Sequence, residues 1–452
     1  MAESSGYDAI VVGGGYAGLT ATRMLDRYGY RVLLLEARDR VGGRVHSLHP
    51  ENGVCLDLGA QWAGPTQDRI HALAAETGVA LYPTYDTGVS TLHMSGRLRR
   101  YKGLIPPLPL PSLISLELAI RRMDRLSRGI DPAAPWSHPD AQRRDRQTLE
   151  GWMHAQMRDR RARDLFRIAA EAIFAAHPSE ISMLFAMFYV RSGRDFGTLM
   201  NIRDGAQQER FQGGADLPAL RLEEMLEGRV IKGLAVRRVA QTDEGVEVSG
   251  HGFSFKAGKL VMAIPPVLMN AIEWEPSLPA ERIQLHQRIP MGCVWKCYAV
   301  YPDPFWRARG WNGIAVSDEG HASLVFDNSP ADGSRGILMA FVLADKARGF
   351  SQLDEGERKA SILRSLKVLF GSEAGSPQLY IDKGWAGEEW SRGCYAGIMG
   401  PHTLSRMGHL LRKPCGHIHW AGTETSDIWN GYMEGAIRSG ERVAEELRNA
   451  LS

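Results

Sequence analysis

The chain has 452 residues, of which 44% are hydrophobic and 23% are charged, and its formal net charge is +2. This length is too great for one ordinary core and predicts two domains. The near-neutral charge does not indicate nucleic-acid or anionic-membrane binding, no apolar run reaches the roughly 18 residues of a membrane span, and five cysteines cannot form a disulfide framework. We therefore expect a soluble, cytoplasmic protein.

The first predicted unit is a strand, a glycine turn, a helix and a second strand. Residues 7–12 form an apolar run typical of a buried parallel strand, and Gly13, Gly15 and Gly18 follow it. A helical stretch then leads to a second strand that ends at Glu36. Glycines permit a tight turn and close approach of a pyrophosphate, the helix N-terminus attracts that anion, and the acid binds a ribose hydroxyl. The unit predicts a dinucleotide site.

A second glycine turn, Gly42-Gly43-Arg44, follows shortly after Glu36. It would bring further N–H donors and a guanidinium to the pyrophosphate. The sequence has no second strand–glycine–helix unit of this kind, so we expect one dinucleotide and no separate nicotinamide. The electrons must then come from the substrate itself.

The remaining elements are predicted from the periodicity of hydrophobic residues and from the positions of prolines and glycines. Four prolines between 106 and 111 predict an extended stretch that is neither helix nor central strand. Helices are expected at 113–127, 148–177, 179–192, 354–370 and 433–447, and strands at 228–264, 293–301, 313–316, 322–326, 337–343 and 417–420. Cys415, His417 and His419 would alternate along the last strand, so we expect no metal site.

Several motifs occur in one order from Tyr7 to about Leu447, among them GGGYAGLTATRML, EARDRVGGR, GPTQDRI, AIPP, MGCVWKCYAVYPDPFW and WAGTETSDIWNGYMEGAIRSGERVA. In them the chain resembles the flavin-containing monoamine oxidase family. The resemblance implies an α/β fold in which a Rossmann-type FAD-binding domain is interleaved with an α+β substrate domain of helices and a mixed sheet. The expected FAD-binding domain comprises residues 1–85, 210–266 and 385–452, and the substrate domain comprises residues 86–209 and 267–384.

Lys296 lies in an apolar, strand-like run in which Val294, Lys296 and Tyr298 share one face. A buried lysine is costly without a partner, so the residues alone leave an edge-strand lysine that reaches solvent as an equal alternative. The resemblance implies a catalytic role, because the family's lysine at this place holds a water beside the flavin N5.

Tyr395 and Tyr432 are either two core aromatics or, as the resemblance implies, a catalytic pair that flanks the re-face of the flavin. Ring faces carry negative potential and orient an amine, and an apolar cage favours its neutral form. Cys394 matches the cysteine that bonds the flavin 8α carbon in the mammalian monoamine oxidases. Microbial relatives often bind FAD without that bond, so covalent and non-covalent FAD both remain open.

The resemblance places further residues at the two sites. Around FAD, besides the three glycines and Glu36, it places Arg38, Gly43, Arg44, Gly59, Ala60, Gln61, Trp62, Val236, Trp385, Cys394, Gly422, Glu424, Thr425, Gly431 and Met433. Around the substrate it places Ala172, Ile173, Met200, Gln207, Leu324 and Phe341. That lining has no carboxylate for a second ammonium and no arginine for a carboxylate, which favours a monoamine.

The implied activity is oxidation of an aromatic or aliphatic primary amine by FAD and oxygen to aldehyde, ammonia and hydrogen peroxide. The alternatives are an oxidase of polyamines, amino acids or secondary and cyclic alkaloid-like amines, and a flavin-binding scaffold without turnover. The expected partners are the amine and oxygen, with no nucleic acid. The hydrophobic tail of the mammalian enzymes is absent, so we expect no membrane anchor; dimerisation is common among the resembling proteins.

Overall fold

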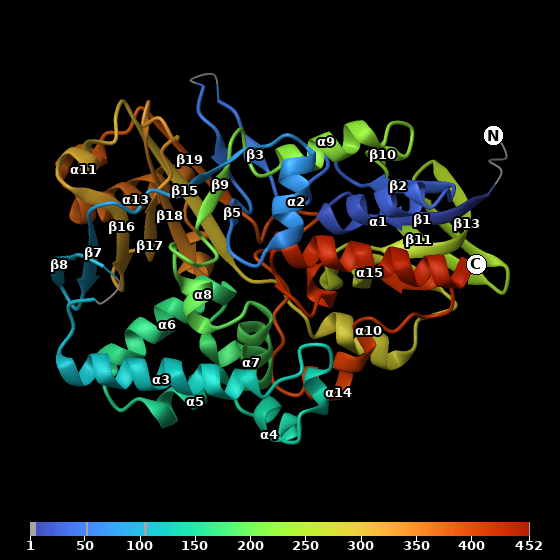
Figure 1. The fold of residues 1–452 in the computed structure, drawn as a ribbon, viewed down its shortest axis with the longest axis horizontal. Coiled ribbons are helices and arrows are strands. Elements are labelled where there is room, and N and C mark those ends of the chain that lie inside the picture. The colour runs from blue at the N-terminus through green and yellow to red at the C-terminus, as the bar shows by residue number, and fades with distance from the viewer. Residues whose placement is uncertain (1–5, 51–52, 104–105, 452) are drawn as a thin grey trace.

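Two large β-sheets organise the chain in the computed structural model, which describes residues 6–50, 53–103 and 106–451 (Figure 1). The first sheet has the strand order β10-β2-β1-β13-β12-β11-β14, with β20 beside the end of β13. Its strands are β1 (Tyr7–Val12), β2 (Val32–Glu36), β10 (Val230–Lys232), β11 (Val236–Thr242), β12 (Gly245–Gly250), β13 (Phe253–Met262), β14 (Glu273–Glu275) and β20 (Ile418–Trp420). Strands β10, β2, β1, β13 and β20 are parallel, whereas β12 is antiparallel to both its neighbours.

Alternation along β1 separates two cores. Ala9 and Val11 face the helices on one side of the sheet, whereas Ile10 and Val12 belong to the core on the other side. The covering helices are α1 (Tyr16–Arg27), α2 (Asp68–Glu76), α9 (Leu217–Met225) and α15 (Met433–Leu451). The carboxyl ends of β1, β2 and β13 meet at the edge that faces the second sheet (Figure 1).

The second sheet has the order β19-β15-β18-β17-β16-β7-β8. Its strands are β7 (Val89–Met94), β8 (Arg97–Tyr101), β15 (Val294–Tyr301), β16 (Trp311–Ser317), β17 (Leu324–Asp327), β18 (Gly336–Leu343) and β19 (Leu379–Gly384). One face packs against α11 (Phe305–Ala308), α12 (Ala344–Phe350) and α13 (Glu355–Phe370). The other face contributes Val294 and Tyr298 to a separate core, as the predicted alternation requires.

Two smaller sheets join the large ones. They are β3 (Ser47–Leu48) with β4 (Leu56–Asp57), and β5 (Trp62–Ala63) with β9 (Glu209–Phe211) and β6 (Leu81–Pro83). Short 3-10 helices are η1 (Pro135–Ser137), η2 (Pro178–Glu180), η3 (Pro266–Ala271), η4 (Ser372–Gly375), η5 (Gly408–Leu410) and η6 (Thr423–Thr425).

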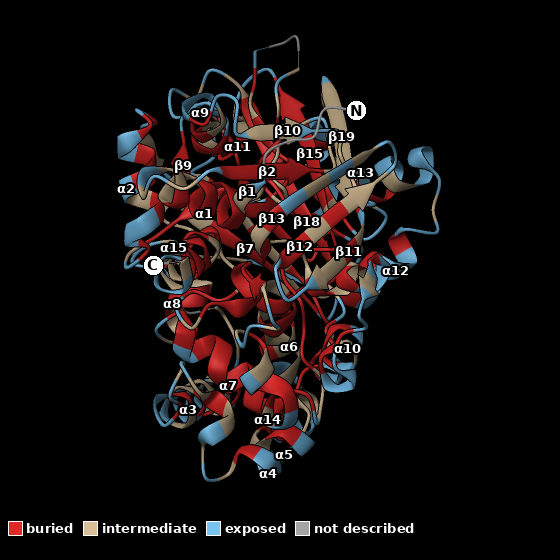
Figure 2. Cartoon of the chain, turned by 90° about the vertical axis from the view of Figure 1, so that its right-hand side faces the viewer, coloured by how far each residue is buried: buried red, intermediate tan, exposed pale blue. Residues whose placement is uncertain are grey.

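A helical layer lies below both sheets in Figure 1. It consists of α3 (Leu110–Arg128), α4 (Ala141–Arg146), α5 (Leu149–Gln156), α6 (Arg160–Phe174), α7 (Met183–Ser192), α8 (Phe196–Met200), α10 (Ala280–Gln287) and α14 (Leu404–Met407). Helix α7 is buried at every residue except Arg191 and forms the centre of this layer (Figure 2).

Three predicted elements differ from the structure, and one is the helix expected over 179–192, which begins at Met183 because the Ser182 side chain caps it. The extended proline stretch was expected to reach 111, but Pro111 lies in the first turn of α3, where a missing N–H costs no hydrogen bond. The single helix expected over 148–177 is two helices, because Asp159 accepts from the Ala162 N–H at 2.8 Å and starts α6 anew.

The domain boundaries remain a prediction. Strand β14 falls within the range 267–384 that was predicted for the substrate domain, but it pairs with β11 in the first sheet. Residues 1–5, 51–52 and 452 of the predicted FAD-binding domain and residues 104–105 of the substrate domain lie outside the described residues.

Candidate active site

The turn between β1 and α1 is built from glycine for three separate reasons. Gly13 has a φ of 107°, which side chains rarely adopt. A Cβ on Gly18 would lie 1.9 Å from the Gly13 carbonyl oxygen, so this glycine lets α1 approach the turn. A Cβ on Gly15 would meet no protein atom within 4 Å, and Gly15 lines a cavity. Because Gly15 makes no side-chain cap, the first N–H groups of α1 remain available to an anion.

Glu36 and the second glycine turn complete this end of the cavity. The Glu36 carboxylate is 3% exposed and accepts hydrogen bonds from the Gly14 N–H at 2.6 Å and the Arg38 N–H at 2.9 Å. The Gly42 N–H donates to the Gly14 carbonyl at 2.8 Å, so the two glycine turns are joined through the main chain. The predicted strand–turn–helix–strand–acid unit is therefore present as one surface.

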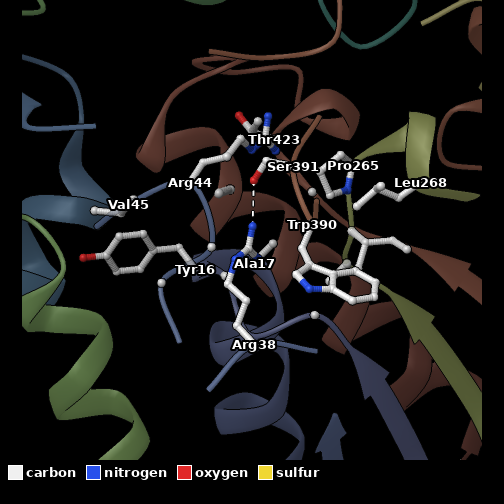
Figure 3. A pocket seen from close by; sticks show the side chains of 18 of the residues that line it. Tyr16, Ala17, Arg38, Arg44, Val45, Pro265, Leu268, Trp390, Ser391 and Thr423 are labelled. Atoms are coloured by element: carbon white, nitrogen blue, oxygen red, sulfur yellow. Dashed lines mark hydrogen bonds between the residues drawn. The ribbon is translucent and has the colours of Figure 1, made fainter. Parts of the chain in front are cut away.

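One cavity, with about 1330 Å³ of empty space counting its open mouth, is lined by residues from this turn to Val294 and Lys296 of the second sheet, and Figure 3 shows side chains around its glycine-turn end. A lining that joins both glycine turns to the second sheet suits an extended ligand such as a dinucleotide. The predicted residues that line it are Gly13, Gly15, Glu36, Arg38, Gly43, Arg44, Gly59, Ala60, Val236, Lys296, Trp385, Cys394, Tyr395, Gly422, Gly431, Tyr432 and Met433.

Two arginines in the cavity wall are held by acids from the C-terminal part of the chain. Arg38 donates to Glu388 and, at 2.9 Å, to the Ser391 hydroxyl (Figure 3). Arg44 binds both carboxylate oxygens of Glu424, at 2.5 and 3.1 Å. Burial alone would raise the pKa of Glu424, but the Arg44 guanidinium outweighs burial and holds that pKa below its ordinary value.

Lys296 projects from the middle of β15 and is only 3% exposed. Its ammonium donates to the carbonyl oxygens of Asp57 at 2.6 Å and Gly59 at 2.9 Å, and to the Gln61 side-chain oxygen at 2.5 Å. Burial lowers the pKa of Lys296 to about 7, although the nearby Asp57 carboxylate favours the charged form. The alternative of an edge-strand lysine in solvent is wrong, because β19 and β18 flank β15 on its two sides.

Cys394, Tyr395 and Tyr432 line the cavity beyond Lys296. The Tyr395 ring meets Phe341 edge-on with ring centroids 6.1 Å apart, and the Tyr432 ring meets Trp429 at 4.8 Å. Burial raises the pKa of both phenols, and it raises the pKa of the Cys394 thiol to about 12. These groups are therefore neutral near neutral pH in the described structure.

Five residues predicted to bind the cofactor lie outside the cavity lining, namely Gly18, Gln61, Trp62, Glu424 and Thr425. Gly18 and Glu424 support residues that do line it. Gln61 binds Lys296, and Thr425 bonds the Gly422 carbonyl at 2.8 Å. Trp62 packs against Phe326 and Phe341, with ring centroids 5.1 and 6.0 Å apart.

The six residues predicted for the substrate pocket also lie outside that lining, behind the two tyrosines. Ala172, Leu324 and Phe341 share a core with Tyr395, and Ile173 and Met200 share one with Tyr432. The Gln207 amide donates to the Leu199 carbonyl at 3.0 Å, and its oxygen is buried without a hydrogen bond. Of the six, Phe341 contacts the Tyr395 ring directly, and the assignment of the six residues to a substrate pocket stays a prediction.

Sequence reasoning missed residues at the cofactor end. Ile264, Pro265, Leu268, Trp390 and Ser391 line the cavity, and Figure 3 shows four of them beside Arg38 and Arg44. Ile264 and Pro265 belong to the AIPP motif at the end of a predicted strand, and Trp390 and Ser391 shortly precede Cys394, so these positions could have been found from the sequence.

Among the described residues, no helix has the length and apolarity to cross a membrane. Within the same residues, no group of three or more His, Cys, Asp or Glu side chains could hold a metal ion. His417 instead lies 3.2 Å from the Lys259 ammonium, and His419 lies 3.4 Å from Glu446.

Comparison with protein families identifies close relatives. The family model for flavin-containing amine oxidoreductases matches residues 16–448. AofH of Mycobacterium tuberculosis, which is assigned as a flavin-containing monoamine oxidase, is 41% identical over 98% of this chain and 97% of its own length. The flavin-containing amine oxidase A of Sus scrofa is 34% identical over 98% of this chain and 85% of its own length.

Solved structures of two oxidases have similar folds. A putrescine oxidase bound to putrescine superposes with a TM-score of 0.94, at 32% identity, over 98% of this chain and 99% of its own. The cyclohexylamine oxidase of Brevibacterium oxydans gives a TM-score of 0.94 at 29% identity, over 99% of both chains.

Proposed function

The chain belongs to the family of flavin-containing amine oxidoreductases and is an FAD-dependent amine oxidase; from this premise we propose that it deaminates a monoamine. The proposed reaction converts an aromatic or aliphatic primary amine, oxygen and water to an aldehyde, ammonia and hydrogen peroxide. One observation carries the choice of a monoamine: none of the six residues predicted for the substrate pocket has a carboxylate that could bind a second ammonium.

The residues of the cavity fit FAD. The open space at Gly15, the available N–H groups of α1 and the Arg44 guanidinium suit a pyrophosphate, and Glu36 suits a ribose hydroxyl. Once bound, FAD supplies the acceptor for the two electrons of the amine. The neutral, buried Cys394 thiol lies in the same cavity, where it either bonds the flavin or packs against it.

The side chains beyond the glycine turns would act on the amine. Tyr395 and Tyr432 offer ring faces that orient an amine nitrogen, and their buried surroundings favour the neutral base. Only that base has the lone pair that assists loss of the α hydrogen. Lys296 would hold a water in the cavity, and the dry, apolar cores around it keep bulk solvent from the reacting atoms.

A diamine oxidase is the second candidate, because the putrescine oxidase has the same fold and a similar degree of identity. A diamine presents a second ammonium, which needs an acid at the far end of the substrate pocket. Glu171 is the buried acid next to the predicted pocket residue Ala172, and Arg167 pairs with it at 3.1 Å. This pairing supports the monoamine.

The deciding experiment is anaerobic mixing of the purified yellow holoenzyme with monoamines, diamines and amino acids while the visible flavin band is recorded. We expect monoamines to bleach the band, and air to restore it with release of hydrogen peroxide. Lys296→Met should slow either the bleaching or the reoxidation of the flavin. Lys383→Met, which alters the residue paired with Lys296 on the neighbouring strand β19, should slow neither step. Bleaching by diamines alone would establish the second candidate, and a band that no amine bleaches would favour a scaffold.

We also propose that the protein works as a homodimer in the cytoplasm. The support for the cytoplasm is that the five cysteines are unpaired, as is common in a reducing compartment. Light scattering of the holoenzyme would measure the oligomeric state.

A further inference from the structure

All three N–H groups of the Lys296 ammonium are engaged by this chain. A lysine ammonium has three donors and no acceptor. Here the donors go to the carbonyls of Asp57 and Gly59 and to the Gln61 side-chain oxygen, all within 2.9 Å. A charged Lys296 in this arrangement therefore has no N–H left for a molecule in the cavity, although its side chain lines that cavity.

Two of the three acceptors cannot move away. Asp57 is fixed in β4, and its carboxylate accepts from the Ser47 hydroxyl at 2.7 Å and the Ala215 N–H at 2.9 Å. At Gly59 the main chain is packed so closely that a Cβ would lie 2.1 Å from the Arg44 carbonyl oxygen. Since both acceptors are main-chain oxygens, only a backbone shift could release them.

Gln61 is the partner that can release Lys296. It is a side chain, it is 2% exposed, and its Nε2 donates to the Asn328 side-chain oxygen at 3.0 Å. A rotation about its side-chain bonds moves the acceptor away from Lys296 without any backbone change. Asn328 therefore holds the Gln61 amide together with the Tyr298 hydroxyl, which donates to the Gln61 side-chain oxygen at 3.3 Å.

We propose that Gln61 is a positioning residue that holds the Lys296 ammonium against Asp57 and Gly59 and frees one N–H toward the cavity when its amide rotates. The proposal rests on the function given above only in assigning Lys296 to the reacting end of the cavity. Gln61 lies outside the cavity lining, so it acts through Lys296.

Burial outweighs the charges around Lys296, and each hydrogen bond that remains to its ammonium favours the charged form. The Asp57 carboxylate favours the ammonium, while burial and Arg210 oppose it, and the neutral Cys394 and Tyr298 add no full charge. Arg210 itself lies 3.9 Å from the Asp57 carboxylate. On the neighbouring strand β19, Lys383 lies over the Trp385 ring, 5.6 Å from its centroid.

The two informative substitutions change the acceptor in opposite directions. Gln61→Met keeps the length of the side chain but removes the acceptor, which disfavours the ammonium and lowers the pKa of Lys296. Gln61→Glu supplies an anionic acceptor, which favours the ammonium and raises that pKa. Because hydrogen bonds to charged groups are among the stronger ones, each shift should be about one pH unit.

The test is the melting temperature of the holoenzyme across pH. The folded pKa of Lys296 is about 7 and its ordinary value is 10.5, so the unfolded chain binds the extra proton between these values and stability rises with pH there. The Lys296→Met variant lacks this rise and serves as the baseline. Relative to it, the melting temperature of the wild type should begin to rise near pH 7. In Gln61→Met the melting temperature should begin to rise at a pH about one unit lower than in the wild type, and in Gln61→Glu at a pH about one unit higher.

Gln67→Met is the matched control, because Gln67 is a buried glutamine of the same segment whose amide makes no hydrogen bond. It should follow the wild-type curve. If the Gln61 variants do not fold, Asn328→Leu loosens the same amide and should shift the rise in the direction of Gln61→Met. Equal onsets in all variants, or shifts of both Gln61 variants in one direction, would overturn the proposal. This readout needs no substrate, so it stands even if no monoamine bleaches the flavin.

Discussion

The two ends of the cavity are built in different ways. The glycine-turn end is made of main chain from one short stretch, in which Gly13, Gly15 and Glu36 lie close together in sequence and in space. The other end, where we propose that the redox reaction takes place, is called the redox end and is made of side chains from distant segments. There Lys296 donates a hydrogen bond to Gln61, which is 235 residues away in the sequence. Shape recognition needs only a rigid backbone, whereas tuning a proton needs buried side chains whose partners differ in charge. The two ends should therefore fail in different ways when altered.

The largest effect is expected at the glycine turn. Gly18→Ala puts a Cβ 1.9 Å from the Gly13 oxygen, so we expect loss of the folded protein. Gly15→Ala adds a Cβ that meets no protein atom within 4 Å, so the protein should melt like wild type yet lose most of its FAD, because the Cβ would occupy the place that we propose for the pyrophosphate. Melting temperature and the flavin-to-protein absorbance ratio measure the two effects. Full flavin content in Gly15→Ala would contradict the assignment of this turn.

The next effect concerns the ion pair between Arg44 and Glu424. Arg44→Met leaves the buried Glu424 carboxylate unpaired and should lower the free energy of unfolding by about 3–5 kcal/mol. Since the folded pKa of Glu424 is lowered, the stability it contributes is present above its unfolded pKa and is lost as pH falls through the folded pKa. Urea unfolding at neutral and acid pH measures both. Arg27→Met, which breaks an exposed pair with Glu76, is the control and should cost below about 1 kcal/mol.

A smaller effect is expected at the tyrosine pair, where ring faces matter more than hydroxyls. Tyr395→Leu removes the ring that meets Phe341 and should lower kcat/KM for the bleaching amine about tenfold. Tyr395→Phe keeps the ring and should stay close to wild type. Steady-state peroxide release measures both, and an equal loss in the two variants would show that the hydroxyl, and not the ring, acts.

The smallest effect on folding is expected at Cys394. Cys394→Ala removes one buried sulfur and should leave the melting temperature nearly unchanged. If the thiol bonds the flavin, acid precipitation carries the yellow colour down with wild type and leaves it in solution with the variant. Colour in solution for both would show that the burial which raises the Cys394 pKa to about 12 keeps it a free thiol.

The sequence predicted the glycine-turn end well because its determinants are local. The run before Gly13, the spacing to Gly18 and the acid at Glu36 each require one backbone geometry, and the structure has all of them. The face of β15 that carries Lys296 also followed from simple alternation. Periodicity over-extended the helix at 148–177, since a capping Asp159 outweighs it.

The sequence predicted which residues form the redox end, but it did not predict which side chains contact one another there. Gln61 was predicted to bind the cofactor because of its motif, yet it lies behind Lys296, and that contact depends on how β4, β5 and β15 pack. The pairing of Arg38 with Glu388 and of Arg44 with Glu424 could likewise not be predicted from the sequence, because these acids lie far from the arginines along the chain. Long-range side-chain pairs leave no trace in local periodicity.

The position of β13 in the first sheet has a consequence for how the protein is made. This strand pairs with β1 on one side and, at residues 260–262, with β20 on the other. A ribosome releases β1 and the glycine turn long before β20 and the cavity residues Gly431, Tyr432 and Met433. The growing chain must therefore carry an unfinished, apolar sheet until β20 has emerged, and the cavity proposed for FAD is complete only once Met433 has emerged.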